Sequence, residues 1–326
     1  LQNKEELRNY SIDITNSDTY DFLFVGMHDF LDKKKPLQES IEYGLNNLEK
    51  ITGDYFLFDG SDSTSLMGAY EVFTNSNAIY LFKNQILKER EMYQNKYAFN
   101  KWFFGNGSDL DLSYDIDEVT WNKIKLSNIN CGRTIFGSGL YPHNINWPTT
   151  KTNKSIDICA IFQTFHDECR DHGVRNDIPY IKHRKEVWDR LDKLKDRYQI
   201  ISKKLPFQEY IDKLAHSKVC ISPFGQGELC FRDYEAMLTG TILIRPDQSN
   251  VTTAPNIFEE GETYIGCKLD WSDLEEKIEY VLDNFKELND KFTSNIRNKF
   301  MQEYTLENFC LSYYNVFSNL QTISKE

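Results

Sequence analysis

Three charged side chains follow a glycine-bearing turn in the second half of the chain. Glu228, Arg232 and Glu235 are four and three residues apart, which places them on one face of a helix if the helix starts near Glu228. Gly225 and Gly227 precede them, and such a turn before a helix N-terminus can hold a phosphate. As a solvated ion-pair stripe the three would contribute only a few tenths of a kcal/mol per pair, about 0.2–0.5. The glycines and the flanking strands favour a binding site.

Two further groups could supply a base for a transfer reaction. The loop from Asp59 to Ser63 follows a predicted strand, and a carboxylate there, with Asp62 preferred over Asp59, could take a proton from an attacking hydroxyl. The same residue types also suit a turn with an N-cap. His28 follows the first predicted strand and is followed by Asp29, so it is a second candidate base, although such a pair is more often a capped turn.

No residue spacing predicts a resident metal. His166, Asp167, Glu168 and His172 have suitable side chains, but their separations match no known zinc pattern. The tripeptide from Asp109 to Asp111 lies in a region without clear periodicity. We therefore expect no metal ligands and no cofactor.

The elements that must position these residues alternate between strands and helices. The stretch 218–221 predicts a strand, 228–239 a helix that Gly240 stops, and 241–244 a second strand, which together make one βαβ unit. Strands are also predicted at 21–26, 54–58, 78–82, 155–162 and 198–202, and helices at 37–50, 183–194, 206–215, 272–285, 288–304 and 306–320. This pattern indicates an α/β protein with two Rossmann-like domains whose parallel sheets face each other across a cleft.

Glycines and prolines between Cys131 and Thr150 suggest the connection between the domains. We therefore expect an N-terminal domain at 1–145 and a C-terminal domain at 146–326. The length of 326 residues is sufficient for two cores.

Composition limits the partners of the chain. The net charge of −12 argues against nucleic acid as a partner, because nucleic-acid binding needs a basic surface. The seven scattered cysteines form no C-x-x-C pair, which predicts reduced thiols and a cytoplasmic location. No stretch approaches the roughly 18 apolar residues of a membrane span. The first residue is Leu1 instead of Met, which is compatible with a longer parent polypeptide.

The run SPFGQGELCFRDYEAMLTGTILIRPD resembles the donor-binding segment of GT-B glycosyltransferases, and is closest to the group-one-like transferases of bacterial and viral glycan synthesis. The later EEGETYI, residues 259–265, also fits that group, in which a similar segment lies beside the nucleotide. The resemblance extends from about Lys218 to Ile265. It is weaker over 155–215. In the N-terminal half it rests only on the predicted alternation of strands and helices and on the FLFDGSDST loop.

The resemblance implies that the N-terminal domain, 1–145, is on the acceptor side. It implies that the C-terminal domain, 146–326, binds the nucleotide-sugar, with the last helix able to cross back. It also implies roles for individual residues. Glu235 would accept hydrogen bonds from the two ribose hydroxyls of a sugar nucleotide. The backbone of Gly225, Gln226 and Gly227 would approach the donor sugar and the diphosphate, with Glu228 beside them. Arg232 and Arg184 would stabilise the diphosphate without a metal.

One position departs from the family pattern. Retaining members carry a first glutamate eight residues before the second, and that position is Gly227 here, with Glu228 one residue off.

We therefore expect a metal-independent, retaining glycosyltransferase that moves a sugar from a nucleotide-sugar donor to a hydroxyl of a glycan or related acceptor. Two alternatives stay open at this point. One is a nucleotide-sugar epimerase-like enzyme, which would need no acceptor. The other is a non-catalytic module that binds a nucleotide-sugar without turnover.

Overall fold

The computed structural model describes the chain in ten ranges, which carry all the structural statements below. These are residues 23–26, 37–51, 55–66, 68–94, 129–131, 153–162, 179–225, 227–305, 307–308 and 311. We call the described residues up to 131 the N-terminal unit, and those from 153 onward the C-terminal unit.

The N-terminal unit is built on a parallel sheet of four strands in the order β1-β2-β3-β5. Its strands are β1 (Leu23–Gly26), β2 (Tyr55–Asp59), β3 (Ala78–Lys83) and β5 (Ile129–Cys131), and its helices are α3 (Leu37–Leu48) and α4 (Ala69–Thr74). Tyr55, Leu57 and Leu81 have almost no exposed surface and pack in one apolar core with residues from both helices. The polar loop that follows β2 therefore starts from a rigid base.

The C-terminal unit contains a parallel sheet of five strands in the order β11-β9-β8-β6-β7. The strands are β6 (Ile156–Cys159), β7 (Ile200–Ile201), β8 (Ser217–Ile221), β9 (Ile242–Pro246) and β11 (Ile265–Cys267). The helices are α7 (Pro179–Asp192), α8 (Phe207–Ala215), α9 (Phe231–Leu238), α10 (Leu274–Asp283) and α11 (Phe285–Glu303). Runs of Ile, Val and Leu in the central strands are buried, as a sheet covered by helices requires.

The strand order of the C-terminal sheet defines where a ligand can bind. Counted within the unit, the order is 2-1-3-4-5, so the chain winds in one direction from β6 to β7 and in the other from β8 to β9. Ligands of such sheets bind beyond the carboxyl ends of the strands, at the point where the winding reverses. In this chain that point lies between β6 and β8.

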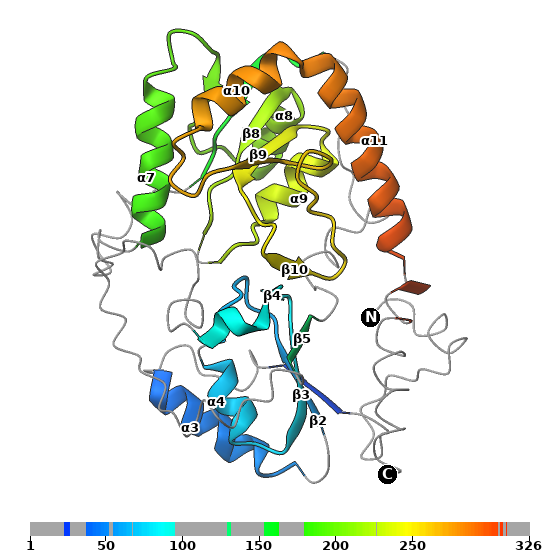
Figure 1. Ribbon diagram of the computed structural model, residues 1–326. Coiled ribbons are helices and arrows are strands. Elements are labelled where there is room, and N and C mark those ends of the chain that lie inside the picture. Colours follow the sequence, from blue (N-terminus) through cyan, green and yellow to red (C-terminus); the bar gives the residue numbers. More distant parts are fainter. Residues whose placement is uncertain are drawn as a thin grey trace.

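Two Rossmann-like units with parallel sheets were predicted, and this fold class is confirmed (Figure 1). The predicted βαβ unit is also confirmed, because β8 pairs in parallel with β9 and α9 connects them. Gly240 ends the helix with a φ of 65°, a conformation that glycine adopts without a side-chain penalty. The predicted domain boundary at residues 145 and 146 lies outside the described residues.

The predicted start of the key helix was wrong. The helix begins at Phe231 and not near Glu228, because the carboxylate of Asp233 accepts the backbone N–H of Cys230 at 3.0 Å and caps the helix there. Glu228 therefore lies in the preceding turn and does not share a helical face with Arg232 and Glu235. Asp233 stands three residues after Cys230, which is the spacing of a capping box.

A pair of short strands connects the two units and was not predicted. β4 (Gln85–Leu87) of the N-terminal unit pairs in antiparallel with β10 (Val251–Thr253) of the C-terminal unit (Figure 1). After β3 the chain forms β4 and then the short 3₁₀ helix η1 (Arg90–Gln94). The units are thus joined by backbone hydrogen bonds as well as by side chains.

Within the described residues, no helix is long and apolar enough to cross a membrane.

Candidate active site

A cavity of about 880 Å³ lies between the two units. The N-terminal unit contributes the loop after β2, and the C-terminal unit contributes the segments after β6 and β8 and the N-terminal turns of three helices. The lining residues are Gly60, Ser61, Asp62, Ile161, Arg184, Leu205, Phe207, Tyr210, Gly225, Leu229, Cys230, Phe231, Arg232 and Glu235. Ile161 and Gly225 follow β6 and β8, so the cavity opens at the winding reversal where a ligand is expected.

Both units thus present the carboxyl ends of parallel strands to one cavity. The chain has the GT-B architecture.

Glu235 lines this cavity from α9, with 9% of its surface exposed. One of its oxygens, Oε2, accepts a hydrogen bond of 2.7 Å from the hydroxyl of Tyr210 on α8. Burial raises the pKa of Glu235, and the nearby Asp233 adds to this effect, while the Tyr210 hydrogen bond and the Arg232 charge oppose it. A carboxylate is thus placed in a partly dehydrated site where a ligand hydroxyl could hydrogen-bond to it.

Arg232 lies one turn before Glu235 and is held by three oxygens. Its Nε donates to Ser222 Oγ at 3.0 Å, its Nη1 to the Ile161 carbonyl at 3.2 Å and its Nη2 to the Pro223 carbonyl at 3.0 Å. Those two carbonyls come from the segments after β6 and β8. A guanidinium has five N–H donors, so Arg232 ties both segments together and keeps donors for an anion in the cavity.

Arg184 approaches the same region from α7. Its Nε donates to the Phe224 carbonyl at 2.8 Å, and its Nη2 would lie 3.1 Å from a methyl group at Gly225. Two cations therefore flank the turn after β8, and a larger residue than glycine at position 225 would crowd one of them. This arrangement suits an anion bound against the turn.

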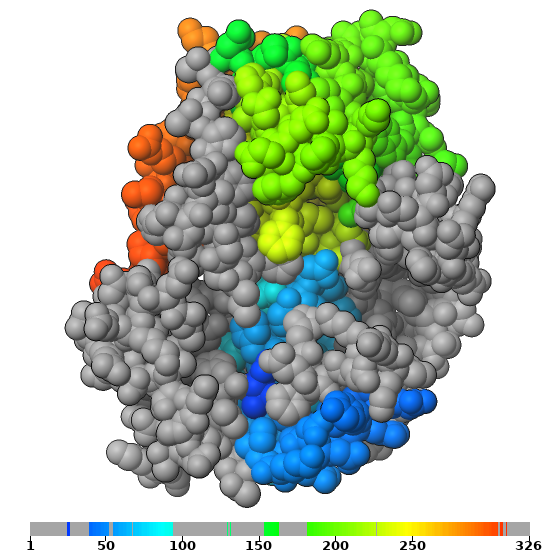
Figure 2. All heavy atoms as spheres, turned by 180° about the vertical axis from the view of Figure 1, so that it is seen from behind, coloured from blue at the N-terminus to red at the C-terminus, as the bar shows by residue number. Residues whose placement is uncertain are grey.

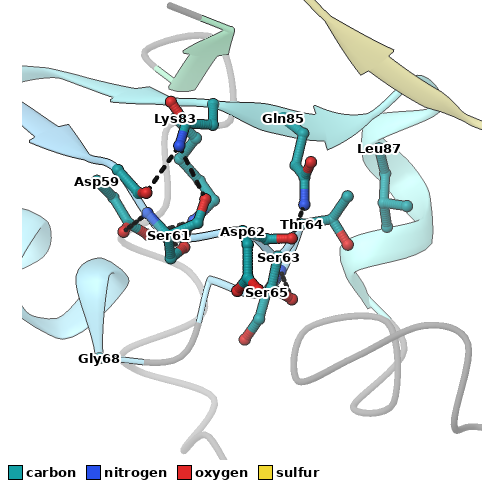
Figure 3. A network of polar contacts seen from close by, with 12 residues as sticks. Asp59, Ser61, Asp62, Ser63, Thr64, Ser65, Gly68, Lys83, Gln85 and Leu87 are labelled. Atoms are coloured by element: carbon teal, nitrogen blue, oxygen red, sulfur yellow. Dashed lines mark hydrogen bonds and ion pairs between the residues drawn. The ribbon is translucent and has the colours of Figure 1, made fainter. Parts of the chain in front are cut away.

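The loop after β2 is supported from below by a buried ion pair. The carboxylate of Asp59 pairs with the ammonium of Lys83, and it also accepts the backbone N–H of Ser61 at 3.0 Å and the hydroxyl of Ser61 at 3.1 Å (Figure 3). Burial alone raises the pKa of Asp59, but Lys83 and the two bonds from Ser61 outweigh it and lower the pKa. Asp59 therefore holds the loop as a carboxylate, which leaves Asp62 as the acidic residue of the loop that lines the cavity.

Of the nine predicted site residues, the cavity brings five together: Asp62, Gly225, Arg232, Glu235 and Arg184. His28 and Gln226 lie outside the described residues. Gly227 and Glu228 do not line the cavity; they lie behind its wall, where the two units meet. Whether the five act on a ligand in the predicted manner stays a prediction.

Glu228 is fully buried, and its carboxylate faces the N-terminal unit. It accepts the backbone N–H of Thr64 at 2.9 Å, the hydroxyl of Thr64 at 2.6 Å and the amide of Gln85 at 2.8 Å. From behind, yellow atoms of the C-terminal unit lie directly against blue atoms of the N-terminal unit (Figure 2). The resemblance predicts a ligand beside Glu228, but in the structure its carboxylate contacts the N-terminal unit.

We expect the substitution Gly227→Ala to destabilise the protein by about 1–3 kcal/mol, the usual cost of overpacking. A methyl group at Gly227 would lie 1.8 Å from the Asp62 carbonyl, which is backbone and cannot rotate away. Urea unfolding measures the effect. Gly266→Ala is the matched control, because its methyl group would crowd only the flexible side chain of Glu260, at 3.0 Å, and would be in ordinary contact with Asp247 Cβ at 3.6 Å. Equal stability of the two variants would contradict the tight junction.

Two important residues were missed by the sequence analysis. Tyr210 contacts Glu235 from a neighbouring helix, and no local pattern indicates a contact across 25 positions. Asp233 forms a buried ion pair of 2.8 Å with Arg245 on β9 and also accepts the hydroxyl proton of Ser222. The charged residue in the otherwise apolar run of β9 was a signal for such a pair, since a buried charge needs a partner.

Comparison with solved structures finds glycosyltransferases. The chain is 14% identical to TarM, with a TM-score of 0.44, and the alignment covers 85% of this chain and 58% of that one. It is 12% identical to sucrose-phosphate synthase from Thermosynechococcus elongatus, with a TM-score of 0.49, and the alignment covers 93% of this chain and 74% of that one. It is 11% identical to HepE from Anabaena, solved in complex with UDP and glucose, with a TM-score of 0.48, and the alignment covers 92% of this chain and 78% of that one. The chain spans little more than half the length of TarM. No family model matches the sequence, and no curated protein matches it.

Proposed function

We propose that the chain is a glycosyltransferase that moves a sugar from a nucleotide-sugar donor to a hydroxyl of a glycan or related acceptor. The donor binds against the C-terminal unit, and the acceptor approaches from the loop after β2. The transfer uses no metal and retains the anomeric configuration, as the resemblance of the donor segment implies.

The observation that carries this proposal is the position of Glu235. Its carboxylate lines a cavity at the winding reversal of a doubly wound sheet, beside two arginines and a glycine turn. A sugar nucleotide needs this combination, because its ribose offers two neighbouring hydroxyls and its diphosphate carries the negative charge. The cavity of about 880 Å³ is within the usual range for small-molecule sites, roughly 300–1,000 Å³.

The structure supports different roles for the two units at the cavity. Arg232 and Arg184 stabilise the nucleoside diphosphate as it leaves with additional negative charge. Asp62 lies in the part of the cavity wall that the N-terminal unit contributes, where it can orient the attacking hydroxyl or accept its proton. Sequestering the donor between two units also limits its hydrolysis by water.

The proposal is tested by thermal shift against a panel of nucleoside diphosphates and their sugar conjugates, followed by product analysis. A ligand that binds only the folded state raises the melting temperature, and the hit identifies base and sugar. Conversion of the bound donor without an acceptor into an isomeric sugar nucleotide would indicate an epimerase. Binding without turnover over a broad acceptor panel would favour the non-catalytic module, and no shift with any nucleotide would contradict the proposal.

A flat ring of the ligand should stack against Phe207. This side chain lines the cavity at the N-terminus of α8 and is 63% exposed, so a ligand ring can reach its face. Stacking of a base on an aromatic ring contributes about 1–3 kcal/mol, so Phe207→Ala should weaken nucleotide binding by roughly 5-fold or more by calorimetry. Phe207→Tyr should retain binding. Tyr280→Ala, which removes an exposed ring on α10 away from the cavity, is the control.

Transfer activity should persist in excess EDTA. The cavity provides two guanidinium groups for the diphosphate, and arginine can stabilise the leaving group without a metal. The measurement is the transfer rate before and after chelation, with and without added Mg²⁺ or Mn²⁺. A rate that disappears with EDTA and returns with a divalent cation would refute metal independence.

A further inference from the structure

We propose that Glu228 is a positioning residue that fixes the acceptor-side loop, residues 60–64, against the donor-side turn, of which residues 225 and 227–230 are described. The inference rests on the proposed function for the reaction it serves, but the contacts that carry it do not. It also differs from what the donor-segment resemblance implies for this position, which is a side chain beside the donor.

The carboxylate of Glu228 contacts three donors, and all of them belong to the N-terminal unit. Thr64 supplies its backbone N–H and its hydroxyl, and Gln85 supplies its side-chain amide. Gln85 also donates to the Asp62 carbonyl (Figure 3). One amide thus connects Glu228 to Asp62, which is one of the loop residues that line the cavity.

The backbone of Glu228 is held equally firmly by the C-terminal unit. Its carbonyl accepts hydrogen bonds from Arg245 and, at 3.2 Å, from Gln248. Side chain and backbone of a single buried residue therefore join the two units. A carboxylate suits this position because it only accepts hydrogen bonds, and each of the three groups facing it donates one.

The residues on either side bring the two loops into direct contact. The N–H of Leu229 donates to the Asp62 carbonyl at 3.3 Å, and Gly227 approaches the same carbonyl so closely that no side chain fits between them. Asp62, Leu229 and Gly225 all line the cavity. The two loops thus form one continuous wall, and a change at Glu228 moves the N-terminal side of the site relative to the donor.

The consequence for the reaction is a separation of binding from turnover. The hydrogen bonds described above for Glu235, Arg232 and Arg184 all lie within the C-terminal unit. Loss of the Glu228 contacts should therefore leave donor binding unchanged but displace Asp62. The transfer rate should then fall, because a small displacement of a reacting group is sufficient to slow the reaction.

The test compares Glu228→Gln with the matched isosteric control Glu275→Gln on α10, which removes an exposed ion pair with Arg197. Hydrogen exchange is measured over residues 55–66, and binding and turnover with the nucleotide-sugar from the thermal-shift screen. For Glu228→Gln we expect exchange of the Thr64 amide to be at least 10-fold faster, nucleotide Kd to stay within 3-fold and kcat to fall at least 10-fold. For Glu275→Gln we expect no change in any of the three.

Thr64→Val is a second variant in case Glu228→Gln fails to fold, because it removes only the hydroxyl donor. It should lower kcat in the same direction, and Thr64→Ser, which keeps both donors, should restore it. Unchanged exchange at residue 64 in Glu228→Gln would overturn the proposal, and so would a loss of nucleotide affinity as large as that of Glu235→Gln. If no nucleotide binds the wild-type chain, the proposed function fails, while the exchange experiment still decides whether Glu228 fixes the loop.

Discussion

Glu235→Gln is expected to weaken nucleotide binding by about 1–3 kcal/mol, which is roughly 5- to 150-fold in Kd. The amide keeps the shape of the side chain and an oxygen that can accept the hydroxyl of Tyr210, but it loses the charge and one of two acceptors. If that oxygen accepts from Tyr210, the ribose hydroxyls would face the amide NH₂, which donates hydrogen bonds and accepts none. Isothermal titration with the nucleotide identified by thermal shift measures the loss.

The same variant should not lose stability, and this separates a binding role from a structural one. Burial raises the pKa of Glu235, so ionisation of this group costs more in the folded chain than in the unfolded chain. Its contribution to stability is present below the ordinary carboxyl pKa and is lost as the pH rises through the raised value. At pH 7, Glu235→Gln should therefore unfold at the same or a higher temperature than wild type, with the difference vanishing in acid.

The pH dependence of binding gives an independent check. As the pH falls through the raised pKa, Glu235 takes up a proton and can no longer accept two hydrogen bonds, so wild-type affinity should fall. Glu235→Gln should lack this component of the pH profile. If the variant binds nucleotide as tightly as wild type at every pH, Glu235 does not contact the ligand.

The part of the fold that was predicted has local signals. The strands β8 and β9 are short apolar runs, Gly240 supplies the positive φ that ends α9, and strict alternation of strands and helices indicates parallel sheets. The strand pair β4–β10 has no such signal. It joins residues 85–87 to residues 251–253, and pairing over such a separation depends on the fold of both units and not on the three residues of either strand.

The candidate site was predicted where its residues follow from position in the βαβ unit. Gly225, Arg232 and Glu235 reach the cavity because the chain must leave β8 at its carboxyl end and enter α9 beside it. The prediction for Glu228 assumed that the helix started there, and the cap formed by Asp233 moved that start to Phe231. The observed helix therefore begins three residues later than the predicted one, and Glu228 lies in the turn before it, where its side chain faces the N-terminal unit. Its partners Thr64 and Gln85 are more than 140 positions away, so its surroundings could not be inferred from sequence.

Asp233→Asn is expected to reduce the free energy of unfolding by about 3–5 kcal/mol, the range for removal of one partner from a buried ion pair. Asp233 and Arg245 have side chains with almost no exposed surface and pair at 2.8 Å. Asparagine would leave the Arg245 guanidinium without this counter-charge, close to the apolar rings of Phe224 and Phe258. Urea unfolding gives the loss, and Glu275→Gln, an exposed ion-pair variant, should cost only about 0–1 kcal/mol.

The same variant should also weaken nucleotide binding, because Asp233 organises three parts of the site. Its carboxylate accepts a hydrogen bond from the Ser222 hydroxyl, whose oxygen accepts one from Arg232. It caps α9 at Cys230. It also orients Arg245, which donates a hydrogen bond to the Glu228 carbonyl. The double variant Asp233→Leu with Arg245→Met should recover part of the stability, since replacing both charges removes the unpaired one. Its nucleotide affinity should stay low, because no carboxylate remains to cap the helix or hold Ser222. Recovery of affinity together with stability would mean that Asp233 supports the fold alone and that Arg232 is positioned without it.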